Sequence, residues 1–125
     1  MKLRIRGNSL RVRLTRSEVD DLAQGGRVED AIAFGPGPSE RIVYAIVARP
    51  AEHVSAALAD GMVTVVLPAS VAKDWAASER VGIEHDQVIG AAGVLRILVE
   101  KDFACLTPRE GKGDEEAFPN PNASC

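Results

Sequence analysis

Five basic side chains lie close together near the start of the chain. They are Lys2, Arg4, Arg6, Arg11 and Arg13, and they alternate with apolar residues in two runs, KLRIR and SLRVRL. In an extended chain this alternation places the basic residues of each run on one face, and a hairpin that pairs the two runs would bring all five to the same face. Arginine suits an anionic group there, because its planar guanidinium donates to two phosphate or carboxylate oxygens at once. The pattern therefore predicts an anion-binding face.

The two runs are separated by Gly7-Asn8, which predicts a hairpin with a two-residue turn. This register sets Lys2 opposite Arg13 and Arg4 opposite Arg11. Like charges that face each other across a ladder destabilise it, by a few tenths to about 1 kcal/mol for each pair. An opposite charge must therefore compensate them.

Three interpretations of the compensating charge stay open. The first is a lattice of ion pairs with carboxylates on neighbouring strands, for which the candidates are Glu29, Glu84, Asp86, Glu100 and Asp102. The second is a phosphate-bearing small molecule, with Glu100 and Asp102 as candidate metal ligands beside it. The third is the acidic surface of a protein partner or of a second copy of the chain, such as the run Asp114-Glu115-Glu116.

The composition excludes several classes of function. The chain has 125 residues, with 15 basic and 18 acidic side chains and a net charge of −3. This balance predicts no general affinity for nucleic acid or membranes, and the low aromatic content of 4% argues against a base-stacking surface. The longest apolar run, Ile42 to Ala48, is far shorter than the ~20 residues that span a bilayer. The first residues do not resemble a secretory signal, so we expect a cytoplasmic protein.

Other chemically active residue types do not form a familiar site. No nucleotide-binding, zinc or nucleophile motif occurs, so we expect no cofactor and identify no catalytic residue. Glu84-His85-Asp86 has the residue types of an acid–base or metal cluster, but strand geometry places His85 on the face opposite to both acids. His53 is predicted to be an isolated, exposed residue and Cys105 a buried, inert thiol.

Capping residues and hydrophobic alternation predict the elements that position these side chains. Thr15 and Glu18 form a capping box for a short helix that ends at Gly25-Gly26. A second helix is predicted over 69–77, and further strands over 28–34, 42–48, 53–58, 62–67, 81–86 and 94–103.

The two halves of the chain follow the same plan. A shift of 53 residues gives seven identities in the 23 positions from 9 to 31. This predicts an α+β fold from a duplicated ββαββ unit, with repeats over about 1–50 and 51–106. Its eight mostly antiparallel strands would form a sandwich or barrel with two short helices. Residues 1–106 would form one domain, and residues 107–125 a flexible polar tail.

Three segments resemble a family of short bacterial proteins of unknown function: GNSLRVRLTRSEV at 7–19, EKDFACL at 100–106 and FPNP at 118–121. The resemblance spans nearly the whole chain and implies no established activity. The duplicated eight-stranded plan is also similar to that of the CYTH-like triphosphate tunnel enzymes, whose first strand carries Glu-x-Glu-x-Lys. Here that strand reads Lys2-Leu3-Arg4-Ile5-Arg6, without the metal-holding carboxylates.

Two functions of different classes follow. The first is a non-catalytic binding or protein-interaction module that self-associates. The alternative is a protein that binds or hydrolyses a phosphorylated small molecule at the basic face, as the similarity to the CYTH-like enzymes implies. The expected partners are a second copy of the chain, an acidic protein or a phosphate-bearing small molecule.

Overall fold

A computed structural model gives the structure of residues 1–103. The predictions for Cys105, for the run Asp114-Glu115-Glu116 and for the tail over 107–125 lie outside these described residues. The described chain folds as β1 (Lys2–Arg6), β2 (Ser9–Leu14), α1 (Arg16–Ala23), β3 (Arg27–Ala33), β4 (Arg41–Arg49), β5 (Ser55–Ala59), β6 (Met62–Pro68), α2 (Ala69–Ala77), β7 (Gly82–Val88), a short 3-10 helix η1 (Gly90–Ala92) and β8 (Val94–Lys101).

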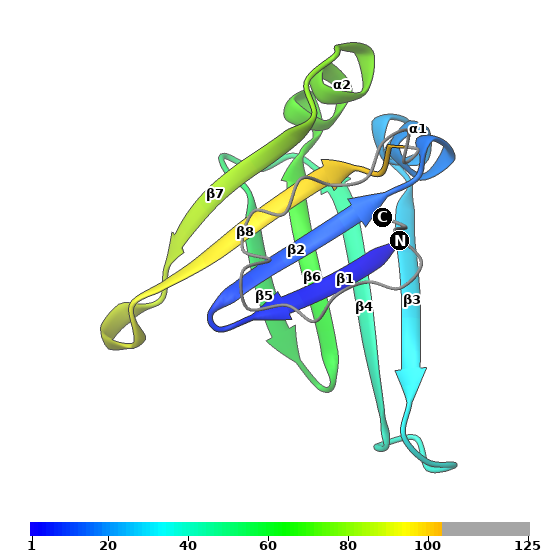
Figure 1. Ribbon diagram of the computed structural model, residues 1–125, viewed down its shortest axis with the longest axis vertical. Helices are drawn as coiled ribbons and strands as arrows, with labels where there is room; N and C mark the ends of the chain where they lie inside the picture. Colours follow the sequence, from blue (N-terminus) through cyan, green and yellow to red (C-terminus); the bar gives the residue numbers. More distant parts are fainter. Residues whose placement is uncertain (104–125) are drawn as a thin grey trace, which may run out of the picture.

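The strands form two four-stranded sheets, one in front of the other in Figure 1. Sheet A has the strand order β1-β2-β8-β7, and sheet B has the order β3-β4-β6-β5. Neighbouring strands are antiparallel except in the pairs β2–β8 and β4–β6, which are parallel. The predicted α+β fold with eight mostly antiparallel strands and two α-helices is confirmed, and the sandwich is the architecture observed.

Each sheet combines strands from both halves of the chain. Sheet A holds the first hairpin of the N-terminal half and the last hairpin of the C-terminal half, and sheet B holds the reverse combination. Strands β1, β2 and β4 and helix α1 begin 53 residues before β5, β6, β8 and α2. Strand β7 departs from this spacing and begins 55 residues after β3. Ile83 pairs with Val99 in sheet A as Val28 pairs with Ile46 in sheet B. The alignment of the two halves at a shift of 53 residues therefore does not hold for β7.

The core lies between the sheets. Val12 of β2, Ile46 of β4, Val65 of β6 and Ile97 of β8 are each 1% exposed or less. Helices α1 and α2 lie together at one end of the sandwich (Figure 1) and add apolar side chains to the same cluster, including the fully buried Trp75. Burial of one such side chain contributes about 1.5–3 kcal/mol to the stability of the fold. Among residues 1–103, no helix is long and apolar enough to cross a membrane.

Helix α1 begins at the predicted capping box. Thr15 Oγ1 accepts a hydrogen bond from the N–H of Glu18 at 3.4 Å, and Glu18 Oε1 accepts one from the N–H of Thr15 at 2.8 Å. These bonds satisfy N–H groups that have no partner inside the first turn of a helix. The chain therefore turns from β2 into α1 at a residue that the sequence identifies.

Side chains between β7 and β5 join one flank of the sandwich. The amide of Gln87 donates through Nε2 to the carbonyl of Ala56 at 2.9 Å and accepts through Oε1 from the N–H of Ala56 at 2.8 Å. It thereby satisfies backbone groups at the free edge of β5, as a neighbouring strand would. Beside it the rings of His53 and His85 stack, with centroids 5.7 Å apart. The prediction that His53 is isolated is therefore wrong.

Candidate binding surfaces

The outward face of sheet A carries the predicted basic residues. The register of β1 and β2 is the expected one, with Lys2 opposite Arg13 and Arg4 opposite Arg11. Alternate residues of β2, such as Val12, point into the core, so the arginines between them point outward. We call the set Lys2, Arg4, Arg6, Arg11 and Arg13 the cationic strip.

Glu100 of β8 neutralises the middle of the cationic strip. It lies directly opposite Arg13 in the parallel ladder of β2 and β8. Its Oε1 accepts from Nε of Arg13 at 2.6 Å and from Nε of Arg11 at 2.7 Å, and it lies 2.7 Å from Nη2 of Arg11. Only 11% of the Glu100 side chain is exposed. Burial by itself would raise the pKa of Glu100, but the hydrogen bonds and charges of the two arginines outweigh it and hold the pKa below its ordinary value.

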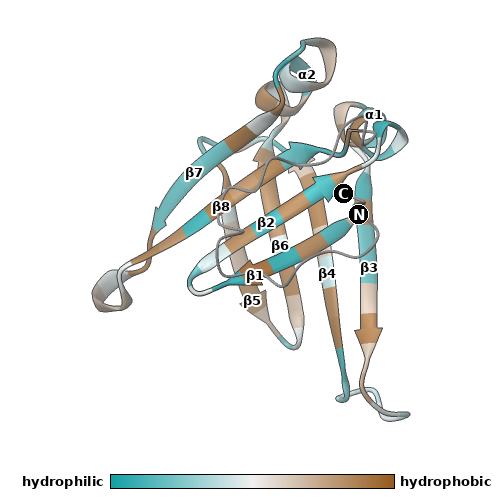
Figure 2. Cartoon of the chain, in the orientation of Figure 1, coloured by the Kyte–Doolittle hydropathy of each residue, from teal (hydrophilic) through white to brown (hydrophobic). Residues whose placement is uncertain are grey.

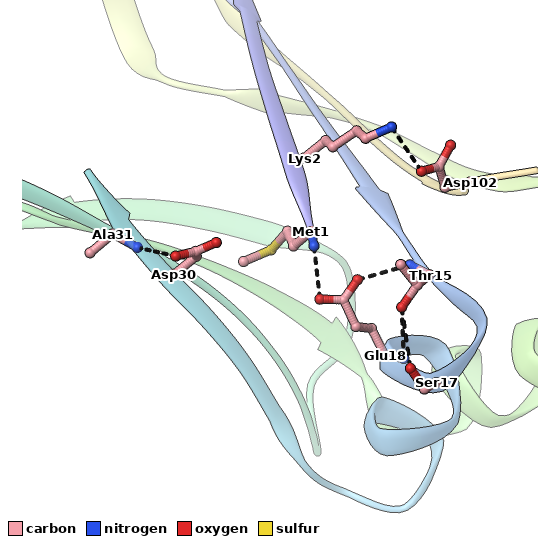
Figure 3. A network of polar contacts seen from close by, with 8 residues as sticks. All are labelled: Met1, Lys2, Thr15, Ser17, Glu18, Asp30, Ala31 and Asp102. Carbon is pink, nitrogen blue, oxygen red and sulfur yellow. Dashed lines mark hydrogen bonds and ion pairs between the residues drawn. The ribbon is translucent and has the colours of Figure 1, made fainter.

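Two weaker ion pairs flank this cluster. Lys2 Nζ lies 3.1 Å from Oδ2 of Asp102 (Figure 3), and Nε of Arg96 donates to Oδ1 of Asp86 at 3.4 Å. Both side chains of the second pair are largely exposed, so water screens it strongly. The interpretation that neighbouring strands supply carboxylates is thus confirmed for Lys2 and for the two arginines on Glu100.

Arg4 and Arg6 form the remaining part of the cationic strip. Both are exposed, and across the ladder Arg4 faces Arg11 while Arg6 faces Ser9. Within residues 1–103, no ion pair includes either of them. Within this part of the chain, the repulsion between Arg4 and Arg11 is therefore only partly relieved, through the single carboxylate that Arg11 shares.

A second carboxylate with a lowered pKa lies at the start of α1. Oε2 of Glu18 is 2.8 Å from the ammonium group of Met1 (Figure 3), while its other oxygen binds the backbone of Thr15. Burial raises the pKa of Glu18, and the hydrogen bonds from Met1 and Thr15 outweigh this effect and lower it. This contact ties the start of β1 to α1.

Within the described part of the chain, no group of three or more acidic, histidine or cysteine side chains is placed to hold a metal ion. The candidate metal ligands Glu100 and Asp102 contact cationic side chains instead. His85 is half-buried, whereas Glu84 and Asp86 on either side of it are exposed, as strand alternation predicts.

The outward face of sheet B has the opposite chemistry. Core residues Ile46 and Val65 alternate along their strands with Ala45 and Val66, which are buried but do not belong to the core cluster. Between the charged residues at the edge and at the strand ends, this outward side carries small or apolar residues, which we call the alanine–valine face: Ala31, Ala33, Val43, Ala45, Val47, Ala57, Ala59, Met62, Thr64 and Val66. Figure 2 shows strand β6 brown over most of its length, whereas β1 and β2 alternate between teal and brown.

Water reaches much of the alanine–valine face. Ala31 and Ala57 are exposed and Val47 and Thr64 are half-buried, whereas Ala45 and Val66 in the middle are only 2% and 6% exposed. Charge on this side is confined to the edge and the strand ends. Arg27 and Glu29 of the edge strand β3 pair with each other at 2.8 Å.

The alanine–valine face was not predicted from the sequence. Its signal is present in 42–48 and 62–67, where apolar residues occupy both alternating sets of positions. Strands that read as continuous apolar runs are typical of sheets buried on both faces. Gln87 was also missed, because a single glutamine in a polar strand gives no signal before its partner strand is known.

The fold and its surfaces define a class of protein: a two-sheet α+β sandwich with one charged and one apolar outer face. The chain belongs to the family of unknown function DUF7009, whose family model matches residues 1–122. The predicted membership of a family of unknown function is thus confirmed. No curated protein and no solved structure matches the chain. Function is therefore inferred from the surfaces themselves.

Proposed function

We propose that the chain is a non-catalytic protein-interaction module that self-associates through the alanine–valine face of sheet B. The observation that carries this proposal is that the centre of the outward side of sheet B is built almost wholly from alanine, valine and threonine. Contact with water is unfavourable by about 25 cal/mol for each Å² of apolar surface. Contiguous apolar patches on the surface of a soluble domain are typical of interaction sites.

A second copy of the chain is the partner that this face fits. Its side chains are short, so two such faces can approach to the ~10 Å at which sheets pack. In a two-fold dimer each face meets itself, which requires that it does not repel itself. The pair of Arg27 and Glu29 at its edge carries one charge of each sign. Arg41 and Arg49 at the two ends of β4 are exposed on the same side, so the two copies must meet with these arginines apart.

The size of the face limits the strength of the dimer. Four strands spaced at about 4.8 Å and about six residues of about 3.3 Å each give a patch of roughly 20 Å by 20 Å. The accessible surface buried by two such patches is then on the order of 1,000 Å², the lower limit for a specific interface. We therefore expect a weak dimer with a dissociation constant in the micromolar range.

Sedimentation velocity and light scattering over a series of protein concentrations test this proposal. The native chain should shift from monomer to dimer as the concentration rises. Thr64→Glu places a charge in the middle of the alanine–valine face, and the half-buried site lets a monomer hydrate that charge. This variant should stay monomeric, because a charge buried in an apolar interface loses its hydration.

Leu58→Glu is the matched control. Leu58 lies on the neighbouring strand β5, points to the opposite side of sheet B and is 73% exposed. The substitution Leu58→Glu introduces the same charge as Thr64→Glu but should leave the dimer intact. A native chain that remains monomeric at high concentration would exclude the proposal, as would a dimer that Leu58→Glu disrupts and Thr64→Glu does not.

The second candidate function is anion binding at the cationic strip. The observation in its favour is that Arg4 and Arg6 are exposed and have no carboxylate partner within residues 1–103. A phosphorylated small molecule would be bound there or, by analogy with the CYTH-like enzymes, hydrolysed. Thermal unfolding with nucleotides or polyphosphate, with and without divalent cations, should show stabilisation that Arg4→Gln/Arg6→Gln removes. An unchanged melting temperature at millimolar ligand would exclude this candidate.

We also infer that the two halves arose by duplication. The support is the common order ββαββ, the shared spacing of 53 residues between most elements, and the exchange of hairpins between the two sheets. On this interpretation the outer faces diverged after duplication, since Arg4, Arg11 and Arg13 of sheet A correspond to Ala57, Thr64 and Val66 of sheet B.

A further inference from the structure

We propose that the acidic run Asp114-Glu115-Glu116 binds the cationic strip of its own chain, at Arg4, Arg6 and the side of Arg11 that faces Arg4. This contact is independent of self-association through sheet B. It supplies the compensating charge that the described part of the chain does not provide.

The charges on sheet A leave the strip with an excess of positive charge. Glu100 is shared by two arginines and Asp102 contacts Lys2, so two carboxylates serve three cations. Arg4 and Arg6 add two more cations without an ion pair among residues 1–103. This end of the strip is therefore the part that attracts a further anion.

The geometry of the pair Arg4 and Arg11 suits a carboxylate. The two residues face each other across the antiparallel ladder, where opposite Cβ atoms lie about 5 Å apart. Arg11 binds Glu100 through Nε and Nη2 on one side, which leaves Nη1 able to donate to another group. A carboxylate between Arg4 and Arg11 would receive hydrogen bonds from both and would remove their mutual repulsion.

The chain leaves sheet A close to this site. The N–H of Asp102 donates to the carbonyl of Leu14 at 2.8 Å, and the side chain of Asp102 contacts Lys2 at the start of β1. Arg4 and Arg6 follow Lys2 at about 7 Å and about 13 Å along the strand. The end of the described chain therefore lies beside the cationic strip.

The segment between Phe103 and Asp114 is long enough for the acidic run to reach the cationic strip. Asp114 follows Phe103 by 11 residues, which span up to about 36 Å when extended and about 18 Å on average as a flexible coil. A tethered segment of this length acts at an effective concentration in the millimolar range. Three consecutive carboxylates held at such a concentration can occupy a site that would bind a free carboxylate only weakly.

Paramagnetic relaxation in NMR tests this contact. A nitroxide label on Gly113→Cys, in a chain that also carries Cys105→Ser and Cys125→Ser, lies next to the acidic run. It should broaden the amide signals of β1 more strongly than those of α2, which lies away from β1 at the end of the sandwich (Figure 1). High salt should reduce the broadening, because it screens exposed charges.

Charge exchange gives a specific control. Arg4→Glu/Arg6→Glu should abolish the broadening of β1, and adding Asp114→Lys/Glu115→Lys/Glu116→Lys to that variant should restore it. Arg41→Glu/Arg49→Glu changes two exposed arginines of β4 by the same charge and should have no effect. The proposal would be overturned if the β1 signals stayed broadened in Arg4→Glu/Arg6→Glu, or if they were not broadened in the native chain.

Mixing distinguishes the chain's own segment from that of a second copy. Isotope-labelled chains without a nitroxide are combined with unlabelled chains that carry it, at a protein concentration where the native chain is monomeric. Absence of broadening in this mixture supports the intramolecular contact. Broadening of β1 equal to that within one chain would overturn it and would assign the strip to an intermolecular partner.

Discussion

Glu100 and Arg13 face each other across the parallel ladder that joins β8 to β2, and the oxygen that binds Arg13 also binds Arg11. One carboxylate thus holds two cations that the hairpin places next to further positive charge. Because only 11% of the Glu100 side chain is exposed, this cluster is better protected from water than an ordinary surface ion pair.

Glu100→Gln should lower the free energy of unfolding by about 1.5–3 kcal/mol, the range for hydrogen bonds to charged groups. The amide is similar in size but removes the negative charge between two arginines. Chemical denaturation measures the change. Asp86→Asn is the control, because its pair with Arg96 is exposed and should contribute less than about 1 kcal/mol. Equal effects of the two substitutions would contradict this account of the cluster.

Acid should destabilise the fold through Glu18 and Glu100. Both have a pKa below the ordinary value of 4.5, so between the two pKa values the unfolded chain binds more protons than the folded one. Their contribution is therefore fully present above about pH 4.5 and is lost as the pH falls through the lowered folded-state pKa values. Denaturation curves from neutral to acidic pH should show this loss, and Glu100→Gln should flatten it. An unchanged slope would show that Glu100 is not a source of the pH dependence.

Gln87→Leu should open the flank between β7 and β5. The substitution leaves the N–H and carbonyl of Ala56 without their partners. The free energy of unfolding should therefore fall by about 1–3 kcal/mol. Hydrogen exchange of the Ala56 amide should become faster, which a general loss of stability would not confine to β5. Val88→Ala changes the neighbouring residue, which is 78% exposed, and should leave this amide unaffected.

Thr15→Ala should destabilise α1 by about 1 kcal/mol, because it removes the side-chain acceptor of the capping box. Thermal or chemical unfolding measures the loss. Ser70→Ala is a suitable control in the first turn of α2, a helix whose N-terminal residue makes no side-chain capping bond. A change as large at Ser70 as at Thr15 would show that the effect does not come from the capping bond.

The sequence by itself determined the local structure of this protein. Alternation with a period of two located β1 and β2, and the pair of Thr15 and Glu18 located the start of α1. Turn length and parity fixed the register of β1 on β2, and with it the opposition of Arg4 and Arg11. All of these features depend on residues close together in the chain, so their energetics can be inferred without the rest of the fold.

Only the tertiary structure decided which strands meet. Five carboxylates were candidates to compensate the cationic strip, and the parallel pairing of β2 with β8 selects Glu100, which is 89 residues from Arg11. The same exchange of hairpins places Gln87 against Ala56 and gathers alanines and valines from four strands onto one outer face. Such contacts join distant segments, and they are favourable only when both sheets bury their inner faces together. Local propensity therefore cannot specify them.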